Sequence, residues 1–257
     1  MNPIMSRLGD RLARYLSRPD PRYQPLATCD PRGVAAIIAP GDVLLVEGNT
    51  RFSKAIKYLS QSTWSHAALY IGTALPDGEP GQWLVEADVV EGVVAVPLER
   101  YAEMHTRICR PVGLGEEERN KVIGYALARL GHRYDLKNII DLVRYLLPQP
   151  PVPTRWRRRM LALGSGDPTR AICSTLIAQA FQSVRYPILP DVTRRPAPRE
   201  DCNDCHDDIL HIRHHSLFVP RDFDISPYFA IVKPALENGF DYRRLTWGDR
   251  EGGAVSA

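Results

Sequence analysis

Residues 65–72, SHAALYIG, and residues 82–88, QWLVEAD, are two short β-type runs separated by a segment rich in Gly and Pro. This arrangement predicts two adjacent strands of a β-hairpin. Side chains alternate between the two faces of a strand, so Glu86 and Asp88 share one face of the second strand. Pairing of the two strands therefore brings one of these carboxylates close to His66.

Segments on both sides of this hairpin carry a strand pattern or a helical period. Strand-type runs occupy residues 42–48, 92–98 and 106–113. Helical periods occupy residues 51–63, 115–131, 136–147 and 173–184. The strands cluster together without regular βαβ alternation, which predicts an α+β fold with a mainly antiparallel sheet.

The composition is that of an ordinary globular protein. Of 257 residues, 44% are hydrophobic and 25% are charged, which excludes collagen, coiled coil and wholesale disorder. A chain of this length can bury a large core without a structural metal or disulfides. The formal net charge of +3 is too balanced to indicate a nucleic-acid partner. We therefore expect no nucleic acid, no metal and no cofactor.

The cysteine spacing and the apolar segments indicate the cellular compartment of the protein. Five unevenly spaced cysteines do not resemble a secreted disulfide framework. Charged residues interrupt the first apolar positions of the chain, so no continuous signal-peptide core is present. No apolar run reaches the roughly 18–20 residues that span a bilayer. The expected location is the cytoplasm.

Two basic segments flank the predicted domain or interrupt it. Residues 1–18 have apolar and Arg positions four apart, as in a short basic amphipathic helix, and residues 155–160 place Arg around Trp156. Both could adhere to an anionic membrane surface, at the inner face of the membrane. The alternatives are a helix packed on its own domain and a solvated Arg-rich loop.

The predicted organisation follows from these segments. Residues 1–30 form a basic amphipathic extension, 31–240 the main domain and 241–257 a C-terminal tail. Within the main domain, residues 148–167 form an Arg-rich insert and residues 192–215 a loop that contains Cys and His.

Cys173 stands where a polar loop gives way to an amphipathic helix. The amide groups and the dipole at a helix N-terminus stabilise a thiolate, and a nearby histidine can lower the thiol pKa further. The alternative is a buried structural cysteine, and Cys109, in the middle of a predicted strand, fits that alternative. A carboxylate beside His66 would hold its imidazole in one tautomer, so Cys173, His66 and an acid could form a catalytic constellation.

Five ordered segments of the chain resemble the YiiX-like group, circularly permuted relatives of the NlpC-type papain-fold cysteine peptidases. They are GDVLLVEG (41–48), TWSHAALYIG (63–72), LVEAD (84–88), GHRYD (131–135) and ICSTLIAQAF (172–181). Residues 217–234 also resemble the closing segment of that group. Lecithin-retinol acyltransferase is a more distant relative of similar permuted order.

The resemblance implies a small antiparallel, barrel-like sheet packed on helices. By position it makes Cys173 the nucleophile, His66 the base and Glu86 the orienting acid. Tyr134 and Trp64 are the expected substrate-binding residues, and the alternative for Tyr134, which follows a helix-ending Gly, is a packing role. Thr175 departs from the group, which often carries Glu two residues after the nucleophile, and this departure is expected to affect packing or substrate fit.

The implied activity is that of a cysteine hydrolase of the amidase or peptidase type, which cleaves an amide bond through a thioester. Its substrate would be a peptide, a peptidoglycan fragment or a lipid-linked amide. The alternatives are acyl transfer to a lipid or amine acceptor and a non-catalytic membrane-surface module.

One cluster stays outside this interpretation. Cys202, Cys205 and His206 spell CxxCH, the haem-attachment pattern, which goes with exported proteins. Zinc is a chemical alternative, although standard finger spacings are absent and neighbouring Asp residues indicate a solvated loop.

Overall fold

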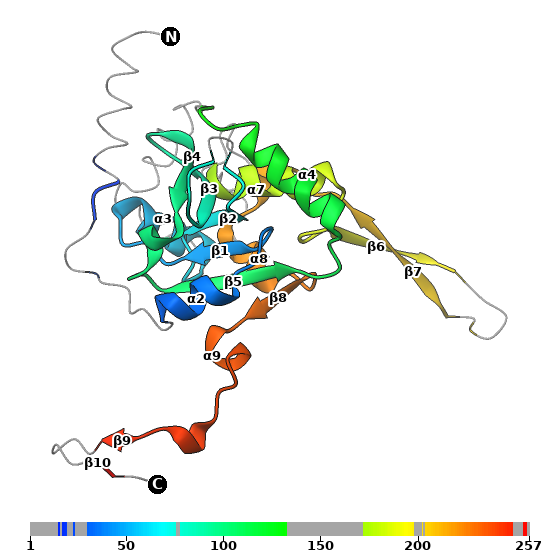
Figure 1. The fold of residues 1–257 in the computed structure, drawn as a ribbon. Helices are drawn as coiled ribbons and strands as arrows, with labels where there is room; N and C mark the ends of the chain where they lie inside the picture. Colours follow the sequence, from blue (N-terminus) through cyan, green and yellow to red (C-terminus); the bar gives the residue numbers. More distant parts are fainter. Residues whose placement is uncertain are drawn as a thin grey trace, which may run out of the picture.

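The computed structural model describes residues 15, 17–19, 23, 30–75, 78–132, 172–197, 202, 204–248 and 254–255. These residues form an α+β fold, as predicted, around one six-stranded sheet (Figure 1). The strands of this sheet are β1 (Val43–Val46), β2 (His66–Gly72), β3 (Trp83–Asp88), β4 (Gly92–Pro97), β5 (Thr106–Pro111) and β8 (Phe229–Val232).

The sheet is antiparallel throughout, in the order β4-β3-β2-β1-β5-β8. The predicted hairpin of β2 and β3 forms, with Leu69 opposite Val85 and Tyr70 opposite Leu84. Among the described strands, β4 and β8 are the two edges, so the sheet is open. The barrel-like sheet that the resemblance implies is therefore not closed.

Helices cover both faces of the sheet. The described helices are α2 (Pro31–Ile37), α3 (Arg51–Ser60), α4 (Glu116–Leu127), α7 (Ile172–Ser183), α8 (Pro220–Ile225) and α9 (Pro234–Glu237). Helix α7 packs against β2, β3 and α4. Helices α3, α4 and α7 confirm the sequence predictions, and the predicted helix over 136–147 lies outside the described residues.

The alternation of side chains along the strands creates two apolar layers. One layer contains Ala67, Leu69 and Ile71 with the apolar residues of α4 and α7. The opposite layer contains Ala68 and Tyr70 with apolar residues of β3 and α2. Alternation predicts this division, and burial of an apolar strand face supplies the main driving force for the packing.

Short 3₁₀ turns join several elements. They are η1 (Leu98–Tyr101), η2 (His215–Leu217) and η3 (Tyr242–Arg244). The turn η1 directly follows β4 and carries Tyr101 into the apolar layer of Ala68 and Tyr70.

Two parts of the chain extend away from the sheet (Figure 1). Strands β6 (Asp191–Pro196) and β7 (His206–His211) form a separate antiparallel hairpin, where the sequence predicts a loop. The C-terminal part contains η3, β9 (Trp247–Gly248) and β10 (Ala254–Val255). None of the helices in the described ranges is long and apolar enough to cross a membrane.

Candidate active site

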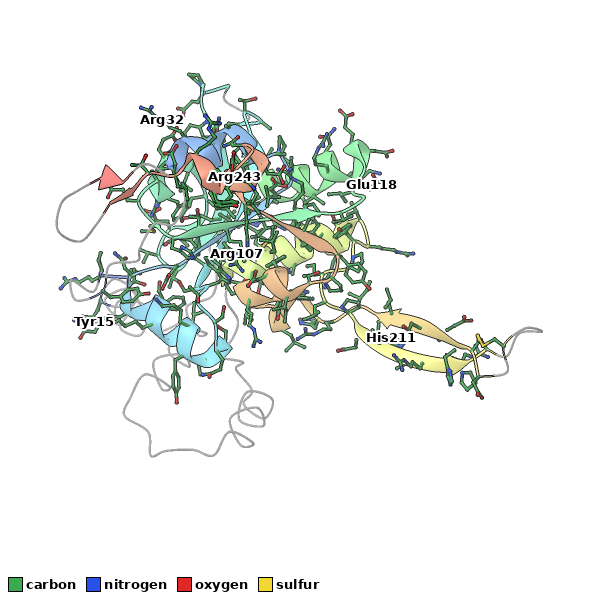
Figure 2. The ribbon with its side chains drawn as sticks, turned by 90° about the horizontal axis from the view of Figure 1, so that it is seen from below. Tyr15, Arg32, Arg107, Glu118, His211 and Arg243 are labelled. Atoms are coloured by element: carbon green, nitrogen blue, oxygen red, sulfur yellow. A yellow bond between two sulfur atoms is a disulfide. The ribbon has the colours of Figure 1, made fainter. Side chains whose placement is uncertain are left out.

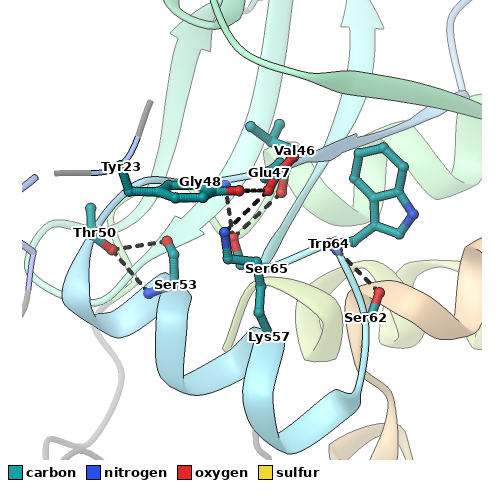
Figure 3. Close-up of polar contacts among 10 residues, drawn as sticks. All are labelled: Tyr23, Val46, Glu47, Gly48, Thr50, Ser53, Lys57, Ser62, Trp64 and Ser65. Carbon is teal, nitrogen blue, oxygen red and sulfur yellow. Dashed lines mark hydrogen bonds and ion pairs between the residues drawn. The ribbon is translucent and has the colours of Figure 1, made fainter. Parts of the chain in front are cut away.

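A network of polar contacts holds the chain just before His66 (Figure 3). The N–H of Gly48, after β1, donates to the Ser65 hydroxyl at 2.9 Å, and the N–H of Ser65 donates to the carbonyl of Val46 at 3.1 Å. A Cβ atom at Gly48 would overlap the Ser53 hydroxyl, so this close approach requires glycine. The network fixes the residue that precedes the histidine.

His66 and Glu86 meet across the hairpin. The imidazole Nε2 lies 2.9 Å from Oε2 of Glu86, whose side chain is only 2% exposed. Asp88, the other carboxylate that the alternation allows, instead accepts the N–H groups of Val90 and Glu91 in the turn after β3. Of the two candidates, Glu86 is therefore the partner of the histidine.

Cys173 lies beside the same histidine. It is the second residue of α7 as described, and this helix packs against the strand that carries His66. The His66 imidazole, the backbone N–H of Ala67 and the Ser174 hydroxyl all act to lower the pKa of the Cys173 thiol, with His66 the largest of the three. Because Glu86 uses Nε2, the nitrogen left for the sulfur is Nδ1. The structure thus brings together the three residues from distant parts of the sequence.

The charges of Glu86, His66 and Cys173 shift one another's pKa values toward the ionised forms. Burial alone would lower the pKa of the His66 imidazolium, but the charges of Glu86 and Cys173 raise that pKa well above its usual value. Burial alone would raise the pKa of the Cys173 thiol, but the His66 imidazolium lowers it. The arrangement therefore favours a thiolate and an imidazolium, the reactive form of a nucleophilic cysteine.

Cys109 provides an internal comparison. This thiol is fully buried in β5, and burial raises its pKa well above the usual value, with the Asp224 carboxylate acting in the same direction. It has no histidine among the groups that shift its pKa. The prediction that Cys109 is a structural residue therefore fits its surroundings, and the two buried thiols differ because only Cys173 has an imidazolium beside it.

Tyr101 is a component that the sequence analysis missed. Its hydroxyl donates a short hydrogen bond to Oε2 of Glu86, the oxygen that faces His66. Its ring also approaches the imidazole, with 6.0 Å between centroids. Burial and the Glu86 charge raise the pKa of Tyr101, so the hydroxyl keeps its proton and remains a donor. No spacing signal connects η1 with the hairpin, which is why sequence alone could not find this contact.

Of the two predicted substrate-binding residues, the structure describes Trp64 but not Tyr134. Trp64 is buried, and its indole Nε1 donates to Oδ2 of Asp224 at 3.0 Å. The indole stacks on His105 and, with Arg107, borders a polar cavity of about 430 Å³. A role for Trp64 in substrate binding stays a prediction. Tyr134 lies outside the described residues.

Thr175 occupies the position where the related group often carries Glu. Its side-chain hydroxyl oxygen is buried and has no hydrogen-bond partner among the residues that the structure describes. An unpaired hydroxyl costs free energy, because water no longer solvates it. This supports an effect of the departure on packing or substrate fit, which stays a prediction.

The structure pairs the two cysteines of the hairpin connection with each other instead of gathering them around a metal ion. Cys202 and Cys205 are joined by a disulfide, and no group of three metal-binding side chains occurs in the part of the chain that the structure describes. The basic segment 155–160 and nearly all of residues 1–18 lie outside the described residues.

Comparison with known proteins supports the resemblance. Residues 37–145 match the model of the family described as permuted papain-like amidase enzyme, YaeF/YiiX, C92 family. The matched range includes His66 and Glu86, and Cys173 follows it along the chain. This match confirms the resemblance to the YiiX-like permuted papain-fold group.

One similar solved structure is the metalloprotein yiiX from Escherichia coli O157:H7. It has 15% sequence identity to this chain and a TM-score of 0.44, and the alignment covers 82% of this chain and 98% of the other. No curated protein sequence matches the chain.

Proposed function

Because residues 37–145 match the model of the YaeF/YiiX family of permuted papain-like amidases, we propose that the chain is a cysteine hydrolase that cleaves an amide bond. The nucleophile is Cys173, the base is His66 and the orienting acid is Glu86. The substrate is a peptide, a peptidoglycan fragment or a lipid-linked amide.

The contact between His66 and the Cys173 sulfur carries this proposal. The Glu86 carboxylate binds the opposite ring nitrogen, which fixes the tautomer and orients the ring toward the sulfur. The same carboxylate stabilises the charged ring, and the charged ring stabilises the thiolate. These are the requirements of an activated cysteine nucleophile.

The reaction follows from the protonation states. The Cys173 thiolate attacks the amide carbonyl carbon, and the His66 imidazolium gives its proton to the leaving amine, so that a thioester forms and the C–N bond breaks. His66, now neutral, takes a proton from water as the water oxygen attacks the thioester. The products are an amine and a carboxylic acid, and the thiol returns to its starting state.

The experiment compares amine release and covalent trapping in matched variants. The full chain is incubated with short peptides, peptidoglycan fragments and N-acyl amides, and acid-quenched samples are searched by mass spectrometry for an acyl group on Cys173. We expect turnover and the acyl adduct in the wild type and in the Cys109→Ala control, and neither in Cys173→Ala. Full turnover in Cys173→Ala would exclude the proposed nucleophile.

The same experiment separates hydrolysis from acyl transfer. Both reactions pass through the same thioester, and they differ only in whether water or another acceptor takes the acyl group. Product analysis with and without added amines distinguishes the two. A free acid as the main product in both samples supports hydrolysis, whereas an acylated amine assigns the chain to acyl transfer.

A further inference from the structure

The β6–β7 hairpin carries the Cys202–Cys205 disulfide at the end that lies far from the sheet (Figures 1 and 2). Figure 2 shows the bond between the two sulfur atoms near the tip of the ribbon, beyond the labelled His211. The two cysteines are three positions apart in sequence. The bond therefore closes a very short loop.

This disulfide does not hold the hairpin together. The strand pairing ends at Pro196 and His206, and one more backbone hydrogen bond joins the N–H of Ala197 to the carbonyl of Cys205 at 2.8 Å. Cys202 lies in the connection between the strands, outside the paired residues of β6 and β7, where it has a separate β-bridge. A crosslink that closes a short loop restricts the unfolded chain less than one that closes a long loop. A structural role explains little of this bond.

The surroundings leave the bond within reach of solvent. Both cysteines are partly exposed, and all six residues of β6 and of β7 are exposed. The two free cysteines in the described part of the chain are different, because Cys109 and Cys173 are buried. Thiol–disulfide exchange needs access of a thiolate to a sulfur atom, and the pair at the hairpin tip provides it.

From this placement we propose that Cys202 and Cys205 form a thiol–disulfide exchange site whose reaction partner is a thiol. A partner thiolate attacks one sulfur of the disulfide, a mixed disulfide forms and the other cysteine leaves as a thiolate that takes up a proton. A second partner thiol attacks the mixed disulfide and releases the first cysteine. The cysteine pair gains two electrons and two protons, and the partner thiols become a disulfide.

The test measures the redox state of one peptide in the full chain. Trypsin cleavage after Arg199 and Arg213 gives residues 200–213, which contain these two cysteines and no others. The protein is equilibrated with mixtures of glutathione and glutathione disulfide that span reducing and oxidising compartments, quenched with acid, and treated with N-ethylmaleimide. A second arm replaces glutathione with a thioredoxin-class dithiol protein, which distinguishes a small thiol from a protein dithiol as partner.

We expect the peptide to change from disulfide to doubly alkylated dithiol within this range of mixtures in at least one arm. The change should be the same in Cys173→Ala, so the result is independent of the proposed hydrolase. A pair that stays oxidised in the most reducing mixture, or reduced in the most oxidising one, would overturn the proposal. Alkylation that proceeds only after addition of a chelator would assign the pair to a metal instead.

A double variant tests the structural alternative. Cys202→Ser combined with Cys205→Ser removes the bond and leaves the strand pairing intact, so the urea midpoint of unfolding should not change. A lower midpoint in the double variant would assign the bond to stability and contradict an exchange role.

Discussion

Nε2 of His66 lies 2.9 Å from Oε2 of Glu86, a residue of β3 whose carboxylate is almost completely buried. A buried carboxylate beside an imidazole stabilises the charged ring strongly, because little water competes for the charge. Glu86 therefore links the fold of the hairpin to the ionisation of the proposed catalytic pair.

Replacement of Glu86 by Gln removes this charge and keeps a similar shape. Since the Glu86 carboxylate raises the pKa of His66, the variant should have a lower His66 pKa. The Cys173 pKa should rise, because the imidazolium that lowers it is less populated. The pH range in which thiolate and imidazolium coexist should therefore become narrower from both sides. NMR titration of the imidazole and the pH dependence of thiol alkylation measure the two shifts, and unchanged profiles would contradict the role of Glu86.

Tyr101→Phe removes the hydroxyl that donates to Glu86 and keeps the ring in place. A neutral hydrogen bond contributes about 0.5–1.5 kcal/mol, so kcat should fall by up to about tenfold, a factor that corresponds to about 1.4 kcal/mol. The pH profile should also shift, because Glu86 then has one donor fewer.

Tyr70→Phe is the matched control for this change. Tyr70 is buried in the same apolar layer as Tyr101 but contributes nothing to the contacts of Glu86. Kinetics that change equally in the two variants would mean that Tyr101 acts only through packing.

The sequence predicts those parts of the fold that depend on the hydrophobic pattern within one or two neighbouring segments. The period of two in β2 and β3 predicts the hairpin and the shared face of His66 and Glu86, because strand geometry fixes which side chains lie together. The strand pattern alone leaves Glu86 and Asp88 as equal candidates, and only the family resemblance chooses Glu86. The structural reason lies in the turn after β3, in which Asp88 accepts backbone N–H groups.

Other features depend on contacts between distant segments. The Tyr101 contact joins η1 to β3, and the Cys202–Cys205 bond depends on how the connection between β6 and β7 folds. The exposed strands β6 and β7 lack the apolar alternation of a half-buried sheet, so the sequence predicts a loop there. Helix α2 has only seven residues, too few for a clear helical period.

Arg110 is predicted to stabilise the fold through Asp42. The guanidinium contacts both carboxylate oxygens of Asp42, at 2.8–3.2 Å, and Nη2 also donates to the carbonyl of Ile37. The Asp42 side chain is 2% exposed, so Arg110→Met leaves a buried charge without its cation. We expect a loss of about 1–3 kcal/mol in the free energy of unfolding, measured by urea denaturation.

The loss of stability in Arg110→Met should depend on pH in a definite direction. Burial already raises the pKa of Asp42 in the folded protein, with Arg110 acting in the opposite direction. Without Arg110 the folded-state pKa should rise further, so the destabilisation should shrink as the pH falls through it and the carboxyl becomes neutral. Lys121→Met, which breaks an exposed ion pair with Glu117, should leave stability nearly unchanged. Equal losses in the two variants would contradict the importance of Asp42.

The basic segments 1–18 and 155–160 predict adhesion to anionic lipid. The full chain should float with vesicles that contain phosphatidylserine at low salt and should dissociate at high salt, because screening weakens electrostatic attraction. Vesicles of phosphatidylcholine alone are the control. Equal binding to both kinds of vesicle, or binding that persists at high salt, would count against an electrostatic interaction.

The rate at which iodoacetamide alkylates Cys173, measured from acidic to alkaline pH in the wild type and in His66→Ala, tests the central pairing most directly. The lowered Cys173 pKa predicts that alkylation in the wild type continues at pH values below those at which an ordinary cysteine reacts. In His66→Ala the same reaction should require alkaline pH. Identical profiles in the two proteins would show that His66 does not activate the thiol, and the proposed mechanism would be wrong.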